Sequence, residues 1–138
     1  MSAKYVRDTQ GGAQMPKSFL VNDNQTIVRG SVLAISGGKV SLAADAAAAG
    51  TIAGVAMEAI TTTTATATDV ILVDINPNSV YNMTHTGTAT PAIGVAYDWY
   101  ADATFDSDDS TGGYFMVDGN VTSTAADVLI GNRYNQVG

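Results

Sequence analysis

Short apolar runs separated by turn residues recur along most of the chain. Asn, Asp, Gly and Pro lie between them, as at Asn76-Pro-Asn78 and Asp118-Gly-Asn120. Runs of this length bounded by turn residues indicate strands. We therefore predict an all-β fold, a small single-domain β-barrel or β-sandwich with at most one short helix. The expected strands lie at 19–21, 26–35, 39–42, 51–57, 69–75, 80–84, 93–100, 114–117 and 128–134.

Details of the pattern sharpen this prediction. Gly30 is expected to bend the run 26–35, and the triplet 36–38 (Ser-Gly-Gly) reads as a hairpin turn. The run 69–75 is almost continuously apolar, which is typical of a strand covered on both faces. The Ala-rich stretch 43–49 would form one or two helical turns. The Thr-rich stretch 61–68 is expected to be an exposed edge strand or a loop.

The first seventeen residues differ from the rest. Residues 8–17 are polar, contain a Gly-Gly pair and a Pro, and show no periodicity. We predict an extended N-terminal arm at 1–17, disordered or ordered by a neighbouring molecule, followed by a β-rich domain at 18–138.

Composition and charge exclude several classes of protein. Charged residues make up 14% of the chain, with Glu58 as the single glutamate, so a helical bundle is not expected. The absence of cysteine excludes a disulfide scaffold and a thiolate zinc site. The net charge of −7 argues against a nucleic-acid partner. The start of the chain has no apolar leader, and no run approaches the ~18 residues that span a bilayer, so no membrane partner is expected.

The charges are unevenly distributed. Residues 1–39 hold five basic and two acidic residues, a net +3, whereas the remaining 99 residues carry a net −10. One interpretation is that the N-terminal stretch docks on an acidic partner; the other is that the asymmetry arose by chance in a small sample. We select Lys4, Tyr5, Arg7 and Lys17 as partner-binding residues, with Phe19 anchoring the arm to the body.

Little in the chain could support catalysis. His85 is the single histidine, and no Gly-x-Ser-x-Gly elbow accompanies it. We therefore expect no enzymatic activity and no cofactor.

One acidic segment resembles a weak calcium loop. Asp106, Asp108 and Ser110 alternate as oxygen ligands do, but Thr111 and Val117 stand where an EF-hand needs Gly and Glu. We interpret the segment as a solvated hairpin loop and keep calcium as an alternative. The aromatic residues around it, within 97–115, indicate core or subunit packing, with a sugar-stacking platform as the alternative.

A set of short motifs resembles a known family. Val28-Arg-Gly-Ser-Val-Leu33 is followed by Lys39-Val-Ser-Leu42, an Ala/Gly-rich linker, Ile52-Ala-Gly-Val-Ala56 and a Thr-rich stretch. The chain then has a strand at 70–75 and ends on an Ile-Gly-Asn-Arg segment at 130–133. This order is similar to that of the head decoration, or capsid cement, proteins of tailed bacteriophages.

The resemblance implies a structural role without catalytic residues. It implies a homotrimer on the exterior of the virion, made in the cytoplasm of a host bacterium, which clamps neighbouring copies of the major capsid protein. The Asp- and aromatic-rich insert at 98–114 has no counterpart in that pattern. The alternative function is a calcium- or carbohydrate-binding surface module that uses this insert.

Overall fold

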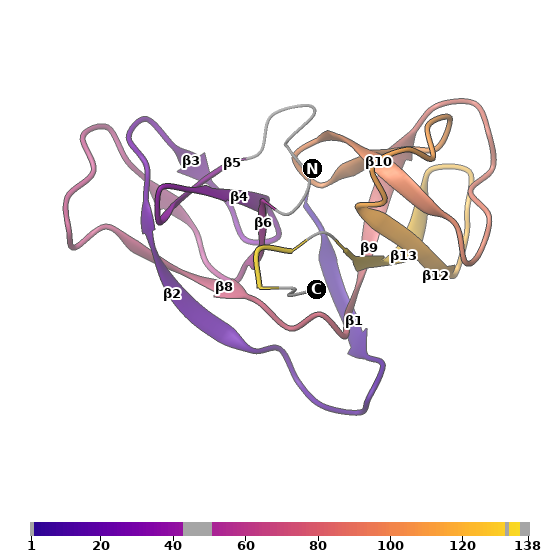
Figure 1. Ribbon diagram of the computed structural model, residues 1–138, viewed down its shortest axis with the longest axis horizontal. Helices are drawn as coiled ribbons and strands as arrows, with labels where there is room; N and C mark the ends of the chain where they lie inside the picture. The colour runs from indigo at the N-terminus through magenta and orange to yellow at the C-terminus, as the bar shows by residue number, and fades with distance from the viewer. Residues whose placement is uncertain (1, 43–50, 132, 136–138) are drawn as a thin grey trace.

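The computed structural model describes residues 2–42, 51–131 and 133–135, and within these ranges it contains thirteen β-strands and no helix. This confirms the all-β prediction. The expected helical turns at 43–49 lie outside the described residues. Figure 1 shows two groups of strands side by side. The strands are β1 (Lys4–Asp8), β2 (Pro16–Val21), β3 (Thr26–Ile27), β4 (Val32–Ser36), β5 (Lys39–Leu42), β6 (Ile52–Ala56), β7 (Ile60–Thr61), β8 (Val70–Asp74), β9 (Ser79–Thr86), β10 (Ala96–Ala101), β11 (Thr104–Asp106), β12 (Phe115–Gly119) and β13 (Ala125–Ile130).

The first group is a closed five-stranded barrel in the order β2-β5-β4-β6-β8, which we call the first barrel. Its β4–β5 hairpin pairs Ser36 with Lys39, and Gly37 and Gly38 between them have φ values of 59° and 79°. Two successive positive φ values are what the tight hairpin turn predicted from the Gly-Gly pair requires. The short pair β3–β7 forms a separate two-stranded sheet.

The second group closes on itself in the same way. Its six-stranded sheet has the order β1-β9-β11-β10-β12-β13, and β13 also pairs with β9 over five residues. The strands β9, β11, β10, β12 and β13 therefore form a ring, the second barrel. Strand β1 is not a member of this ring; it pairs antiparallel with β9 on the same side as β11, next to it along the strand.

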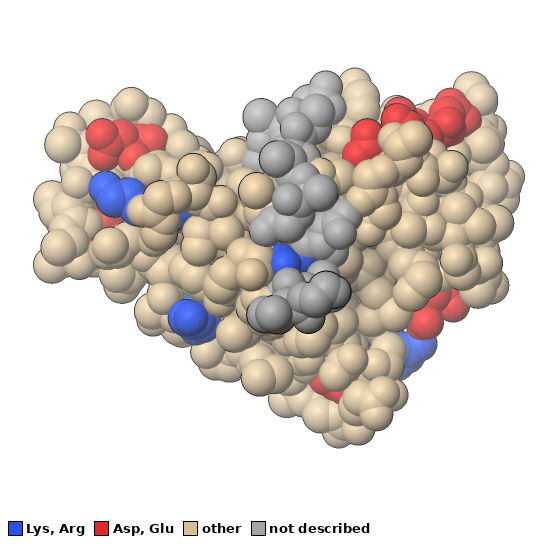
Figure 2. Space-filling model, viewed as in Figure 1, with Lys and Arg blue, Asp and Glu red and all other residues tan. Residues whose placement is uncertain are grey.

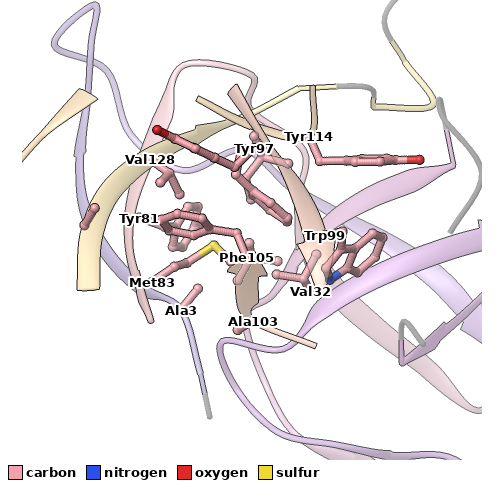
Figure 3. Close-up of a cluster of buried hydrophobic side chains, with 14 of the residues drawn as sticks. Ala3, Val32, Tyr81, Met83, Tyr97, Trp99, Ala103, Phe105, Tyr114 and Val128 are labelled. Carbon is pink, nitrogen blue, oxygen red and sulfur yellow. The ribbon is translucent and has the colours of Figure 1, made fainter. Parts of the chain in front are cut away.

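The two barrels share a wall, and strand β6 forms the centre of it. All five residues of β6 are buried. Ala53 and Ala56 contribute to the core of the first barrel, whereas Ile52 and Val55 pack into the core of the second. Figure 3 shows the second core, in which Trp99, Phe105 and their neighbours form one buried cluster. The two apolar cores therefore lie on opposite faces of β6.

This arrangement corrects the expectation for 69–75. Strand β8 is not covered on both faces, because Val70 and Leu72 are exposed while Ile71 and Val73 are buried. The doubly buried strand is β6, where Gly54 allows close approach of the backbones. A β-carbon on Gly54 would lie 2.0 Å from the carbonyl oxygen of Asp74 in β8.

The N-terminal segment also differs from the expectation of an arm that gains little from its own domain. Ala3 is buried in the second core, and its backbone N–H donates to the carbonyl of Gly30 at 2.8 Å. Gly30 has a φ of 91°, and a β-carbon there would lie 2.5 Å from the Ala3 carbonyl oxygen. The predicted bend at Gly30 is thus the place where the N-terminal segment crosses the first barrel.

Candidate partner-binding face

Strand β1 is the most open backbone edge of the described structure. Each strand of the two rings has at least two partner strands, whereas β1 pairs with β9 alone. Within residues 2–42, 51–131 and 133–135, it is the one strand longer than two residues with a single partner. Its first four residues are exposed and Asp8 is buried. The register shifts between Tyr5 and Arg7, so Val6 occupies a bulge.

A cavity of about 160 Å³ lies beside β1, between the N-terminal segment and the first barrel. The Tyr5 ring forms one side and packs edge-on against Tyr81 with 5.7 Å between the ring centroids. Arg29 also lines the cavity, and no ion pair of Arg29 occurs among the described residues. The cavity is lined by Ala3, Tyr5, Gln14, Arg29, Gly30, Val55, Ala56 and Tyr81.

A network of hydrogen bonds centred on the buried side chains of Tyr81 and Asp74 lies beneath this face. The Tyr81 hydroxyl donates to Oδ2 of Asp74 at 2.5 Å and accepts from Nε2 of Gln14 at 2.9 Å. Oδ1 of Asp74 accepts the backbone N–H of Met15 at 2.9 Å and that of Asn76 at 3.0 Å. Burial, followed by the hydrogen bond to Asp74, raises the pKa of Tyr81. The Tyr81 hydroxyl therefore stays protonated and serves as a donor.

A second set of hydrogen bonds fixes the loop between β1 and β2. Oδ1 of Asp8 accepts the backbone N–H of Gln10 at 2.6 Å, and Oδ2 accepts from Nδ2 of Asn76. The same Asn76 amide donates to the carbonyl of Ala13 at 2.9 Å. The bond from Gln10, with smaller help from Asn76, lowers the pKa of Asp8. The ionised carboxylate of Asp8 thus bonds directly to the start of the loop at Gln10, and it is linked to the later part of the loop at Ala13 through the Asn76 amide.

The structure brings only some of the predicted partner-binding residues to this face. Lys4 and Tyr5 lie exposed on β1. Arg7 is also on β1, but it forms an ion pair with Asp118 of β12, so its charge is compensated within the chain. Lys17 lies elsewhere, with its Nζ 5.6 Å from the Phe19 ring centroid.

Phe19, which we selected as a partner-binding residue that anchors the arm to the body, is 7% exposed, belongs to the first core and packs edge-on against Tyr134. A side chain inside the barrel is not available to a partner. The alternation of β2, with Phe19 and Val21 buried and Leu20 exposed, explains this position.

Sequence reasoning missed Arg29 and Gln14 as neighbours of Tyr5. Arg29 was counted among the basic residues, but its place beside Tyr5 depends on the crossing of the chain at Gly30. Gln14 lay in the predicted arm. Neither position follows from spacing along the chain. Figure 2 shows that charged groups of both signs are scattered over the visible face, with acidic groups at its upper left and upper right corners.

The carboxylates of the acidic segment accept backbone hydrogen bonds, both from a neighbouring loop and from within the segment. Asp108 accepts the backbone N–H groups of Thr88 and Ala89, each at 2.8 Å, and these bonds lower its pKa. Asp106 accepts the N–H of Asp108 at 2.9 Å, while Ser110 is exposed. Among the described residues, no group of three or more acidic or histidine side chains is placed to hold a metal ion.

The remaining candidates have structural contacts. The His85 ring packs 5.4 Å from that of Phe105, and Nε2 lies 3.1 Å from the carbonyl oxygen of Thr122. Most aromatic side chains of the insert belong to the second core, which confirms the core interpretation, although Tyr100 is exposed. The buried ones are Tyr97, Trp99, Phe105, Tyr114 and Phe115.

Comparisons with known proteins add no family. No family description matches the chain, and no curated protein matches it either. The part of the chain that the structure describes contains no helix of the length and hydrophobicity needed to span a bilayer.

Proposed function

We propose that this protein decorates the outer surface of an assembled phage capsid and stabilises it by bridging neighbouring copies of the major capsid protein. The order of motifs described above supports this proposal, because it is similar to that of phage head decoration proteins. A structural role also suits a chain whose one histidine packs against Phe105 and whose Asp108 accepts backbone N–H groups of a neighbouring loop, at Thr88 and Ala89.

The observation that carries the proposal is the open edge of β1. Closing a sheet into a barrel removes its edges, and an edge that stays open offers free backbone N–H and C=O groups to another strand. Addition of a strand to such an edge is a common way to bind an extended segment of a partner. Lys4, Tyr5 and Val6 flank this edge with exposed side chains. A capsid-protein segment that adds to β1 would lie along them.

The charges beside the edge favour an acidic partner surface. Lys4 is exposed, and Arg29 at the rim of the adjacent cavity has no ion pair within the described ranges. Complementary charge speeds docking and selects its orientation more than it adds affinity. Repetition of the contact over a symmetric lattice would compensate for a modest single affinity.

The test is binding of the purified protein to intact heads of the phage that encodes it, followed by co-sedimentation. Val6→Pro removes an N–H group at the bulge and blocks strand addition at the edge. We expect it to weaken binding at least about tenfold, which is roughly the effect of losing 1.4 kcal/mol. Val6→Thr keeps the N–H and the branched shape, so it should bind like the wild type.

A melting curve for each variant checks that the fold survives. Removing residues 1–16 would be a poor substitute, because Ala3 belongs to the core and Gln14 bonds to Tyr81. If the folded Val6→Pro protein binds heads as tightly as Val6→Thr, the edge is not the contact. If neither the wild type nor any variant binds at micromolar concentration, the proposed function is wrong.

A further inference from the structure

The outer face of the first barrel carries an apolar patch on β2 and β8. Neither strand pairs with β1, which belongs to the other sheet. Leu20, Val70 and Leu72 are 37%, 44% and 38% exposed. Leu20 is paired directly with Val70, and Ser18 is paired with Leu72. Because paired residues point to the same face of a sheet, these side chains form one contiguous surface. We call it the β2–β8 patch; Figure 1 shows the two strands side by side.

Two opposite charges lie at opposite corners of this patch. Lys39 of β5 is paired with Leu20 on the side away from β8, and it is exposed. On the other side, Oε1 of Glu58 accepts the backbone N–H of Leu72 at 2.9 Å, and Glu58 is also exposed. The order across the sheet is therefore Lys39, the apolar residues, then Glu58. Glu58 is the single glutamate of the chain.

This order is self-complementary. In a symmetric dimer each surface contacts its own copy, so residue i meets residue j and residue j meets residue i. A two-fold axis can lie between two facing sheets, perpendicular to the line from Lys39 to Glu58. It would stack the apolar centres and place each Lys39 against Glu58 of the second copy. An apolar centre with a charged rim is also the usual anatomy of a protein interface.

We infer that the β2–β8 patch binds a second copy of this chain, face to face, with reciprocal Lys39–Glu58 pairs at its rim. The apolar side chains supply the affinity, and the ion pairs fix the orientation, because exposed ion pairs add little stability by themselves. The inference does not depend on the proposed capsid role and needs no other partner. Three half-exposed side chains make a small centre, so the dimer forms in a concentration-dependent equilibrium.

The first experiment is sedimentation velocity of the full chain over a range of concentrations. The wild type should shift from monomer to dimer as its concentration rises. Leu72→Asp, which puts a charge in the centre of the patch, should raise the dissociation constant at least about tenfold. Met116→Asp is the matched control, because Met116 is a 41% exposed strand residue of the second barrel. It should dimerise like the wild type.

The second experiment reverses the rim charges. Lys39→Glu and Glu58→Lys should each weaken the dimer, since each places like charges together. The double variant should recover affinity that both single variants lose, and melting curves verify the fold in every case. A wild type that stays monomeric to millimolar concentration overturns the inference. Dimerisation that Leu72→Asp leaves unchanged, or a folded double variant without recovery, overturns it equally.

Discussion

Gly54 determines how closely β6 can approach β8, its neighbour in the first barrel, and its replacement tests this close approach. The β-carbon of Gly54→Ala would lie 2.0 Å from the Asp74 carbonyl oxygen, a backbone atom that cannot rotate away. We expect a loss of at least about 2 kcal/mol in the free energy of unfolding, measured by urea denaturation. Gly119→Ala is the control: Gly119 is also in a strand, but a β-carbon added there would meet nothing within 4 Å. It should change stability by less than about 0.5 kcal/mol, and equal losses would contradict the close approach.

Asp8 makes the attachment of the N-terminal segment sensitive to acid. Its hydrogen bonds with Gln10 and Asn76 lower its pKa, so the folded state holds the Asp8 proton less tightly than the unfolded state does. The resulting stability is complete above about pH 4, where the unfolded carboxyl is ionised, and is lost as the pH falls through the lower folded pKa. The melting temperature of Asp8→Asn should therefore lie below that of the wild type near neutral pH, with the gap shrinking toward about pH 3.

Comparing the melting temperatures of the wild type and Asp8→Asn at each pH separates the contribution of Asp8 from those of the other carboxyl groups. Asp108 and Asp109 also have lowered pKa values, whereas burial raises the pKa of Asp102. Their contributions are present in both proteins and cancel in the difference. A gap between the melting temperatures that stays constant with pH would show that the Asp8 charge does not hold the loop.

Among the elements, those with strong local signals were predicted and those defined by remote contacts were not. The β4–β5 hairpin follows from two glycines, and the apolar runs locate β2, β6, β8, β9, β12 and β13 within a few residues. Strand β11 was missed because its three residues lie in the Asp-rich insert, yet it pairs with both β9 and β10. Strand β1 was missed because its four exposed residues leave no apolar alternation.

The strands β6 and β8 show why burial could not be assigned from a single run. Both are apolar throughout, apart from Gly54 and Asp74. The difference is that β6 stands between two barrels, whereas one face of β8 meets solvent. A short apolar run is compatible with either environment. Sequence reasoning selected Lys4 and Tyr5 on the candidate binding face, but not their neighbours Arg29 and Gln14, because those positions depend on where the N-terminal segment crosses at Gly30.

At the scale of the whole molecule, the shared wall joins the barrels into one unit of stability. Separation of the two barrels would expose Val32, Ile52 and Val55 to water, because these residues belong to first-barrel strands but pack into the second core. We expect a single calorimetric transition whose van't Hoff enthalpy equals the measured enthalpy, as in two-state unfolding. Val55→Ala should lower its midpoint without splitting it. Two resolved transitions would show that the barrels are independent.

The pairing of β1 with β9 also constrains the order in which the molecule can be built. Lys4 lies opposite Asn82, and the second ring closes only when β13 joins β9 near the end of the chain. During synthesis β1 must wait for a partner strand that is made after it, while the first-barrel strands between β2 and β8 can already assemble. Pairings so distant in sequence form slowly. Strand β1 therefore stays unpaired until β9 has been made, after all the strands of the first barrel.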